Sequence, residues 1–351
     1  MEKITTICKK KQLPNTQQPP LVSVCIPVFN GENFISEAIR SVLVQTLEDF
    51  ELLIVDNCST DRTCSIVDSF KDPRIKLKRN EKNLGSIPNF NRCIELASGE
   101  YFLLLSHDDF LMPTALETFS NSLFRHEDVG LVFSSYYIVS ESSVKDDLRI
   151  ISHTNEIWDT MTAVKEIIRL CNPIQSTMVR RKVIADLGGF DIKMAVCCDI
   201  DLWFRIVWSG QTSVAYICEP QSCIRIHPNQ GQNLFANRLK NLKQIKDHFV
   251  SLEVIPSRSQ FTFDYLEKLF NKIGNVPNRK QLQLYALDWL LQIQLRLVYE
   301  SIKQRDAGSL LLEYSVFREI VRWSSGINVF GHYFFSTARF TVEKIFKKLL
   351  P

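Results

Sequence analysis

Short apolar runs alternate with amphipathic stretches over the first part of the chain. Strand-like runs cover residues 22–28, 50–55, 74–78 and 101–105. Between the first two runs, apolar residues recur every three or four positions, as on one face of a helix: Phe34, Ile35, Ala38, Ile39, Val42 and Leu43. This alternation of strand and helix predicts an α/β fold with a mostly parallel central sheet flanked by helices, in a Rossmann-like arrangement.

The pattern continues less regularly to residue 230 and then changes. We expect a polar loop at 140–157 and a short helix that ends at Gly188 and Gly189. Further strands are expected at 129–139, 174–179, 213–217 and 221–226, and further helices at 160–170 and 199–208. From residue 231 onward the spacing is helical, which predicts a helical C-terminal appendage.

The last predicted helix, residues 330–350, is both amphipathic and basic. Its apolar side chains fall on one side, and its cationic residues are Arg339, Lys344, Lys347 and Lys348. Such a helix can lie in a membrane interface, or it can pack against protein. The sequence leaves both alternatives open.

Composition and charge are those of a globular protein. The 351 residues are 45% hydrophobic and 23% charged. The net charge of +3 divides unevenly, with −5 over residues 1–230 and +8 over the remainder. We expect no nucleic-acid partner. Residues 1–20 are polar and basic, so we expect a disordered lead-in and no signal peptide.

The cysteines and the hydropathy indicate the compartment. The ten cysteines are scattered and show no CxxC spacing, which favours reduced thiols over a zinc site. No uncharged apolar run is long enough to span a bilayer. We therefore expect a cytoplasmic location, with possible peripheral contact on the inner face of the plasma membrane.

Two adjacent carboxylates, Asp108 and Asp109, follow the apolar run at 101–105. Burial of two carboxylates without a partner is costly, and Mg²⁺ or Mn²⁺ bridged to a phosphate is a natural partner. The alternative is a solvated turn before the next helix. Asn30 and Asp56 also follow predicted strands. Ligands of such sheets bind at the carboxyl ends of the strands, so these polar residues are expected to meet at one edge.

At this point the sequence resembles a known family. Residues 21–230 look like an inverting family 2 glycosyltransferase with the GT-A fold. The resemblance rests on the order of several motifs: 22–30, Asp56-Asn57-Cys58-Ser59-Thr60-Asp61, Asn83-Leu84-Gly85, Gly99-Glu100-Tyr101, Asp108-Asp109, Gly188-Gly189-Phe190-Asp191 and Cys198-Asp199-Ile200-Asp201-Leu202-Trp203. It divides the domain into a nucleotide-sugar-binding half, 21–138, and an acceptor-binding half, 139–230.

The resemblance implies a role for each acidic residue. Asp109 would bind the metal, Mn²⁺ or Mg²⁺, and Asp108 would face the ribose. His227, in Arg225-Ile226-His227-Pro228, would reach the metal or the diphosphate, although a loop histidine without a role is the alternative. Asp199 would be the general base.

Two departures from the family pattern concern the base and the phosphates. The family usually carries Glu-Asp where this chain has Cys198-Asp199, so the aspartate that matches the base is kept. Asp201 is expected to be structural or to orient the acceptor. The family often has Ala-Arg-Asn where this chain has Pro88-Asn89-Phe90-Asn91-Arg92, and Arg92 could pair with a phosphate or be a solvated helix residue.

The donor pocket implied by the resemblance is formed by Pro27, Val28, Phe29, Glu32, Asp56 and Asn57. For Asn57, a turn-forming role is equally compatible. The expected donor is a UDP- or dTDP-sugar, and the expected acceptor is a glycan or lipid-linked hydroxyl in cell-surface polysaccharide synthesis. Two alternatives remain: a sugar-nucleotide nucleotidyltransferase, and a non-catalytic binding protein that keeps the fold.

Overall fold

The computed structural model describes residues 18–150, 152–160, 162–163, 166, 177–192, 198–208 and 213–227. The chain divides into two units, Met1–His227 and Pro228–Pro351, and every described residue belongs to the first. Most of the predicted lead-in, the whole helical appendage and most of the helix expected at 160–170 lie outside the described residues. Among the described residues, no helix is long and apolar enough to cross a membrane.

The helices and strands follow the predicted order closely in the first half. The strands are β1 (Val22–Val28), β2 (Phe50–Asp56), β3 (Ile75–Arg79), β4 (Tyr101–Leu104), β5 (Phe110–Leu111), β6 (Val129–Val139), β7 (Lys145–Arg149), β8 (Glu156–Trp158), β9 (Thr177–Arg180) and β10 (Ser213–Arg225). The helices are α1 (Ile35–Leu43), α2 (Thr63–Ser69), α3 (Ser86–Leu96), α4 (Ala115–Arg125), α6 (Arg181–Asp186) and α7 (Cys198–Trp208).

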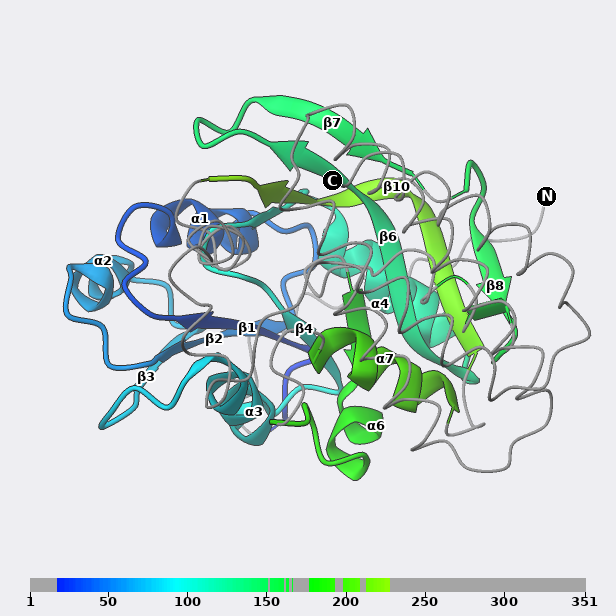
Figure 1. Ribbon diagram of the computed structural model, residues 1–351, viewed down its shortest axis with the longest axis horizontal. Helices are drawn as coiled ribbons and strands as arrows, with labels where there is room; N and C mark the ends of the chain where they lie inside the picture. Colours follow the sequence, from blue (N-terminus) through cyan, green and yellow to red (C-terminus); the bar gives the residue numbers. More distant parts are fainter. Residues whose placement is uncertain are drawn as a thin grey trace, which may run out of the picture. The chain divides into compact units, whose positions relative to one another are not determined.

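Within the described residues there is one ten-stranded sheet, with the main order β3-β2-β1-β4-β9-β6-β10-β5, while β7 pairs with β6 and β8 with β10 off this path (Figure 1). The first four strands are parallel, so their carboxyl ends share one edge. The second half is mixed, because β9 runs antiparallel to both β4 and β6. The predicted α/β fold is confirmed.

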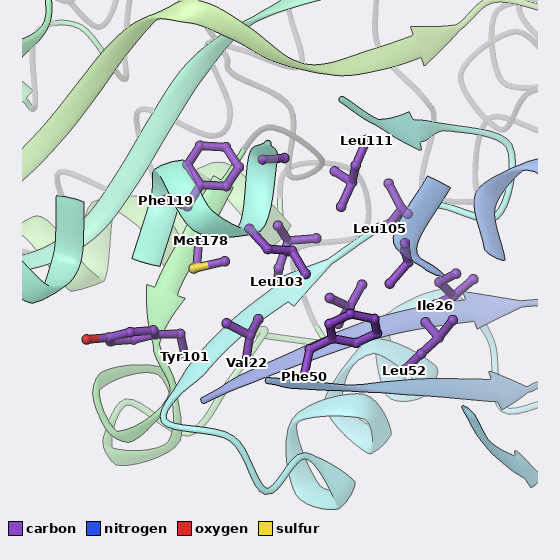
Figure 2. Packing of buried hydrophobic residues seen from close by; sticks show 14 of the residues in the cluster. Val22, Ile26, Phe50, Leu52, Tyr101, Leu103, Leu105, Leu111, Phe119 and Met178 are labelled. Carbon is purple, nitrogen blue, oxygen red and sulfur yellow. The ribbon is translucent and has the colours of Figure 1, made fainter. Parts of the chain in front are cut away.

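The core lies mainly on the face of the sheet that α1 and α4 cover. Alternate residues of β1, such as Val22 and Ile26, point to this side and pack with Leu103, Leu105 and Phe119 (Figure 2). The helix α3 packs against β1 and β2. Cys25, on the opposite face of β1, directs its thiol to the Cys93 carbonyl of α3. Because both faces are covered, β1 and β2 are buried along their whole length.

Two features of the second half differ from the prediction. Residues 140–157, expected to be a loop, contain β7, which pairs with β6, and β8, which pairs with β10. The β7 sequence, KDDLR, has no apolar alternation because the strand lies off the main path of the sheet and is largely exposed. The strands expected at 213–217 and 221–226 form one strand, β10. Its register against β6 shifts between Ile217 and Ser222, around Pro220, which has no amide hydrogen to donate.

Candidate functional site

The site lies at the carboxyl edge of the parallel half of the sheet. Pro27 and Val28 end β1 and are buried, whereas the ring of Phe29 is 44% exposed just beyond the strand. The Asn57 amide donates a hydrogen bond to the Val28 carbonyl at 2.8 Å, which holds the ends of β1 and β2 together. Of the three predicted donor-pocket residues at 27–29, only Phe29 offers a large exposed side chain.

The two loops that follow β1 and β2 are tied together by side-chain hydrogen bonds. The main-chain amides of residues 30–32 donate to Ser59, Thr63 and Asp61 at 2.8–3.0 Å. In return, the Glu32 carboxylate accepts from the amide and the Nε atom of Arg62 at 3.1 and 3.0 Å. The predicted pocket residue Glu32 therefore contacts Arg62 at this edge.

Asp56 is fully buried at the end of β2, and its carboxylate contacts the Arg79 guanidinium and the Ser59 main-chain amide. Its Oδ2 atom lies 3.3 Å from Nε of Arg79, and both its oxygens accept from the Ser59 amide. The Arg79 side chain is 54% exposed and also donates to the Ser59 carbonyl. Arg79 ends β3 directly opposite Asp56 and adds a cationic donor to the edge that sequence reasoning did not identify.

Asn57 is buried in a network of neighbouring polar groups. Its Nδ2 atom donates to the Asn83 side chain and the Gly85 carbonyl, at 2.9 and 3.1 Å. Its Oδ1 atom accepts from the Asn80 side chain and the Leu84 amide, at 3.0 and 2.9 Å. Since an amide has two donors and one acceptor oxygen, these contacts occupy the side chain. The turn-forming alternative matches these contacts.

The acidic loop after β4 meets the end of β10. Oδ2 of Asp108 lies 3.0 Å from Nε2 of His227, and both side chains are about nine-tenths buried. The Phe34 ring packs on the imidazole at 4.8 Å between centroids. The two residues are 119 positions apart in sequence, and the fold brings them together as a carboxylate and an imidazole.

Asp109 lies deeper than Asp108. Its Oδ1 atom accepts from the Arg225 amide of β10 at 2.7 Å, and its buried Oδ2 atom has no hydrogen-bond partner in the described part of the chain. Burial, and then the charge of Asp108, raise the pKa of Asp109 well above its usual range. A buried carboxylate oxygen without a donor is costly, and a nearby cation would lower that cost.

Asp108 and His227 fit a divalent cation whose ligands come partly from the protein and partly from a bound substrate. Carboxylate oxygen and imidazole nitrogen are both ligands of Mn²⁺, and two ligands at right angles, each about 2.1 Å from the ion, would lie about 3 Å apart. No group of three or more such side chains with metal-site geometry occurs within the described ranges. Phosphate oxygens and water would therefore have to complete the coordination.

At the start of α7 the two aspartates differ in their surroundings. Asp201 is buried, and its Oδ2 atom accepts from Nε of Arg205 at 2.7 Å. Arg205 also donates to the carbonyls of Leu187 and Gly189, so it joins α7 to the turn after α6. Asp199 is partly exposed in the first turn of the same helix. The structure thus gives Asp201 a structural contact and leaves Asp199 closer to the surface.

The helix α3 holds the segment before α7. Asn91 exchanges two hydrogen bonds of 2.8 Å with the main chain of Phe190, while Phe90 packs edge-on against the Phe190 ring. Arg92 is about half exposed and pairs with Glu95 at 2.8 Å. Of the two alternatives for Arg92, this arrangement favours the solvated helix residue.

Sequence reasoning missed three residues that surround the acidic loop: Phe34, Glu37 and Arg225. Arg225 is 1% exposed, and its side chain contacts Glu37 and the main chain of Asp108. An arginine in a buried strand is unusual without a partner, and this was the signal available in the sequence. Its partners could not be read from the pattern, because they come from distant segments.

Comparison with known proteins gives a consistent result. Residues 23–188 match the model of a family described as "Glycosyl transferase family 2". The chain is similar to an uncharacterised glycosyltransferase of Rickettsia typhi, with 31% identity over 238 residues, covering 66% of this chain and 72% of the relative. It is also similar to WfgD of Escherichia coli, named as a UDP-Glc:α-D-GlcNAc-diphosphoundecaprenol β-1,3-glucosyltransferase, with 36% identity over 124 residues, covering 35% of this chain and 49% of the relative.

Solved structures support the GT-A fold. Staphylococcus aureus TarS, solved with UDP-GlcNAc, superposes with a TM-score of 0.56 at 16% identity, covering 85% of this chain and 91% of that chain. The mannosyltransferase PcManGT from Pyrobaculum calidifontis, solved with GDP-Man and Mn²⁺, gives a TM-score of 0.52 at 17% identity, covering 97% and 91%. At these identities the likeness concerns the fold alone.

Proposed function

We propose, since this chain belongs to glycosyl transferase family 2, that it transfers a sugar from a nucleotide-sugar donor to an acceptor hydroxyl with inversion, in a reaction that depends on a divalent metal. The observation that carries this proposal is the Asp108–His227 pair at the carboxyl edge of the sheet, beside the buried oxygen of Asp109. A bound cation there would neutralise charge on the departing diphosphate.

Geometry favours Asp108 and His227 as the metal ligands. The resemblance predicted Asp109 in place of Asp108, together with His227, and the metal-binding role of Asp109 stays a prediction. A donor diphosphate arrives from solvent, and the Asp108 side chain is 10% exposed, whereas Oδ2 of Asp109 is enclosed and Oδ1 is held by a β10 amide. Asp109 would then not bind the metal itself, but its carboxylate would add negative potential that favours a cation next to Asp108.

Asp199 is the proposed general base. Inversion by direct displacement needs one group that accepts the proton of the acceptor hydroxyl as the sugar is transferred. Asp199 is partly exposed, while Asp201 contacts Arg205 and supports the turn after α6. Because the Asp201 carboxylate already holds Arg205, Asp199 is the proposed residue for the proton transfer.

Phe29 and Arg79 are the proposed contacts to the nucleoside, and Asp56 is proposed to hold Arg79 in place for them. Phe29 is exposed, and Arg79 is a 54% exposed donor at the end of β3 that is paired with the buried Asp56 carboxylate. A guanidinium donor suits an acceptor on the edge of a nucleobase or on the ribose. Pro27, Val28, Glu32 and Asn57 would shape the pocket mainly through the loops that they hold. The proposed donor is a UDP- or dTDP-sugar.

The acceptor and the cellular role are proposed from the relatives. WfgD is named for transfer to a diphosphoundecaprenol-linked sugar, and we propose a glycan or lipid-linked acceptor in cell-surface polysaccharide synthesis for this chain. Catalysis would take place on the cytoplasmic side, at or near the inner face of the plasma membrane.

A panel of nucleotide sugars tests the proposed function. UDP-, dTDP- and GDP-sugars are assayed for hydrolysis and for thermal stabilisation, each with Mn²⁺, with Mg²⁺ and with a chelator. We expect one nucleotide class to stabilise the protein, and we expect the chelator to abolish that effect. Equal stabilisation with metal and with chelator would contradict the proposed metal dependence.

A further inference from the structure

Arg225 is buried at the centre of a polar cluster that joins four segments. Its Nε atom donates to the Asp108 carbonyl at 2.8 Å, and its Nη2 atom contacts Oε2 of Glu37 on α1 at 2.5 Å. Its Nη1 atom donates to the Glu141 carbonyl at 2.8 Å and the Ser143 hydroxyl at 2.9 Å, in the turn between β6 and β7. All three guanidinium nitrogens therefore hold partners from outside β10.

Aromatic rings enclose the same guanidinium. The central carbon of Arg225 lies 4.9 Å from the ring centre of Phe34 and 5.6 Å from that of Phe110. Phe34 also packs on His227, so one ring contacts both residues. The rings cover the guanidinium, which is 1% exposed, whereas the Glu37 side chain that it contacts is 42% exposed.

The turn between β6 and β7 is fixed by the same cluster. Ser143 has a positive φ of 65°, and its hydroxyl donates to the Glu37 carboxylate at 2.9 and 3.0 Å. The main chain from Ser140 to Val144 is closed by a hydrogen bond of 2.9 Å. Glu37 thus receives hydrogen bonds from both Arg225 and Ser143, and it links the turn to the strand that carries His227.

From this geometry, and resting on the proposed function, we propose that Arg225, Glu37 and Ser143 are positioning residues for the cation and the diphosphate. Arg225 holds the acidic loop through the Asp108 carbonyl and the Asp109 side chain, and His227 follows it by two residues. The cluster therefore sets the separation of Asp108 and His227, and it makes that separation depend on the β6–β7 turn.

The negative charge of Glu37 gives it a second role, because it balances the positive charge of Arg225. The Arg225 guanidinium is a fixed positive charge next to the acidic loop, and by itself it would oppose a cation there. The Glu37 carboxylate balances that charge at 2.5 Å. Loss of the Glu37 charge would leave Arg225 unbalanced, and a cation would bind less tightly even if the fold were intact.

Direct titration of Mn²⁺ tests the proposal without relying on activity. Free Mn²⁺ is followed by electron paramagnetic resonance in the presence of UDP and, separately, of GDP. Glu37→Gln keeps the shape of the side chain and removes its charge, and we expect Mn²⁺ affinity to fall by about 10-fold or more, as for other supporting partners of metal ligands. Ser143→Gly suits the positive φ and removes one hydroxyl, and we expect a loss of about 5-fold.

Arg180 supplies the matched control. It is also a largely buried arginine that donates to main-chain carbonyls, those of Val129 and Leu123, but it lies away from the acidic loop. Arg180→Lys should lower the melting temperature and leave Mn²⁺ affinity unchanged. Wild-type Mn²⁺ affinity in both Glu37→Gln and Ser143→Gly would overturn the proposal.

Asp108→Asn separates this inference from the proposed function. If Asp108→Asn weakens Mn²⁺ binding and Glu37→Gln does not, the ligand assignment stands and the positioning role is wrong. If Asp108→Asn binds Mn²⁺ like the wild type, the ligand assignment fails, and the positioning role that acts through Asp108 fails with it.

Discussion

Asp201 and Arg205 form an ion pair one turn apart on α7, with Oδ2 and Nε separated by 2.7 Å. The Asp201 side chain is 1% exposed, and Arg205 extends the contact to the carbonyls of Leu187 and Gly189. The pair fixes the start of α7 against the turn after α6. It also separates the role of Asp201 from that of its neighbour Asp199, and this separation can be tested.

Asp199→Asn should retain donor binding and lose turnover by about 10²–10⁴-fold, because the acceptor proton would have no base. Asp201→Asn should chiefly lower stability, by about 3 kcal/mol, since it leaves the largely buried Arg205 without its charged partner. Steady-state kinetics and thermal unfolding of both variants distinguish the two roles. An active Asp199→Asn enzyme alongside a folded but inactive Asp201→Asn enzyme would reverse the assignment.

Asp108→Asn and Asp109→Asn should differ in their effect on metal binding. Asp108→Asn should abolish the stabilisation that Mn²⁺ and a nucleoside diphosphate give together, because it removes a ligand. Asp109→Asn should weaken this effect without abolishing it, since Asp109 would act only through its charge. Thermal shift with and without Mn²⁺ measures both. If only Asp109→Asn abolishes the Mn²⁺ effect, then Asp109 is the ligand, as the resemblance predicted.

Stability should depend on pH through Glu51. Burial alone would raise the pKa of Glu51, but hydrogen bonds from Lys76, Ser23 and Ser98 lower it from 4.5 to about 2. The folded-state pKa is therefore depressed, so the contribution is fully present above pH 4.5 and is lost as the pH falls toward 2. A shift of this size corresponds to about 3 kcal/mol.

Glu51→Gln tests this contribution in urea unfolding followed from pH 7 down to pH 3. The variant should be less stable at neutral pH, and its stability should fall less steeply with acid than that of the wild type. Glu95→Gln is the control, because Glu95 is 61% exposed and pairs only with Arg92 in the described structure. Parallel pH profiles for wild type and Glu51→Gln would contradict the prediction.

The basic segment at 330–350 is predicted to bind membrane surfaces. Arg339, Lys344, Lys347 and Lys348 would meet anionic headgroups, at roughly 1 kcal/mol per residue. Co-sedimentation with anionic and neutral vesicles compares the full chain with a form that ends at Ser325. We expect anionic vesicles to bind only the full chain, and less so at high salt. Equal binding by both forms would argue for packing against protein.

The regular part of the fold could be predicted because it depends on local periodicity. The run 22–28 is apolar except for Ser23, since both faces of β1 are covered, and this near-continuous apolar pattern can be read from the sequence. The same logic placed Asp56 and Asp108 at the carboxyl edge. The strand β7 was missed because its stability comes from pairing with β6, and a polar edge strand shows no alternation.

The supporting contacts of the site could not be predicted in the same way. Arg225 draws its partners from α1, from the acidic loop and from the β6–β7 turn, and only the three-dimensional fold brings these together. Asn57 shows the reverse case, because its place in a recognised motif suggested ligand contact while its hydrogen bonds go to neighbouring turns. Residue type and spacing indicate chemistry, but they do not specify which partner a polar side chain takes.

The end of β10 contacts the acidic loop, and this limits where two such enzymes can be joined in a chimera. The family match ends at residue 188, before Asp199, Arg225 and His227. A chimera of two transferases with its crossover after residue 188 would take Asp108 from one parent and β10 from the other. The donor parent's loop would then have to fit a foreign arginine and histidine. Exchanges of donor specificity should therefore carry the 213–227 segment together with the first half of the chain.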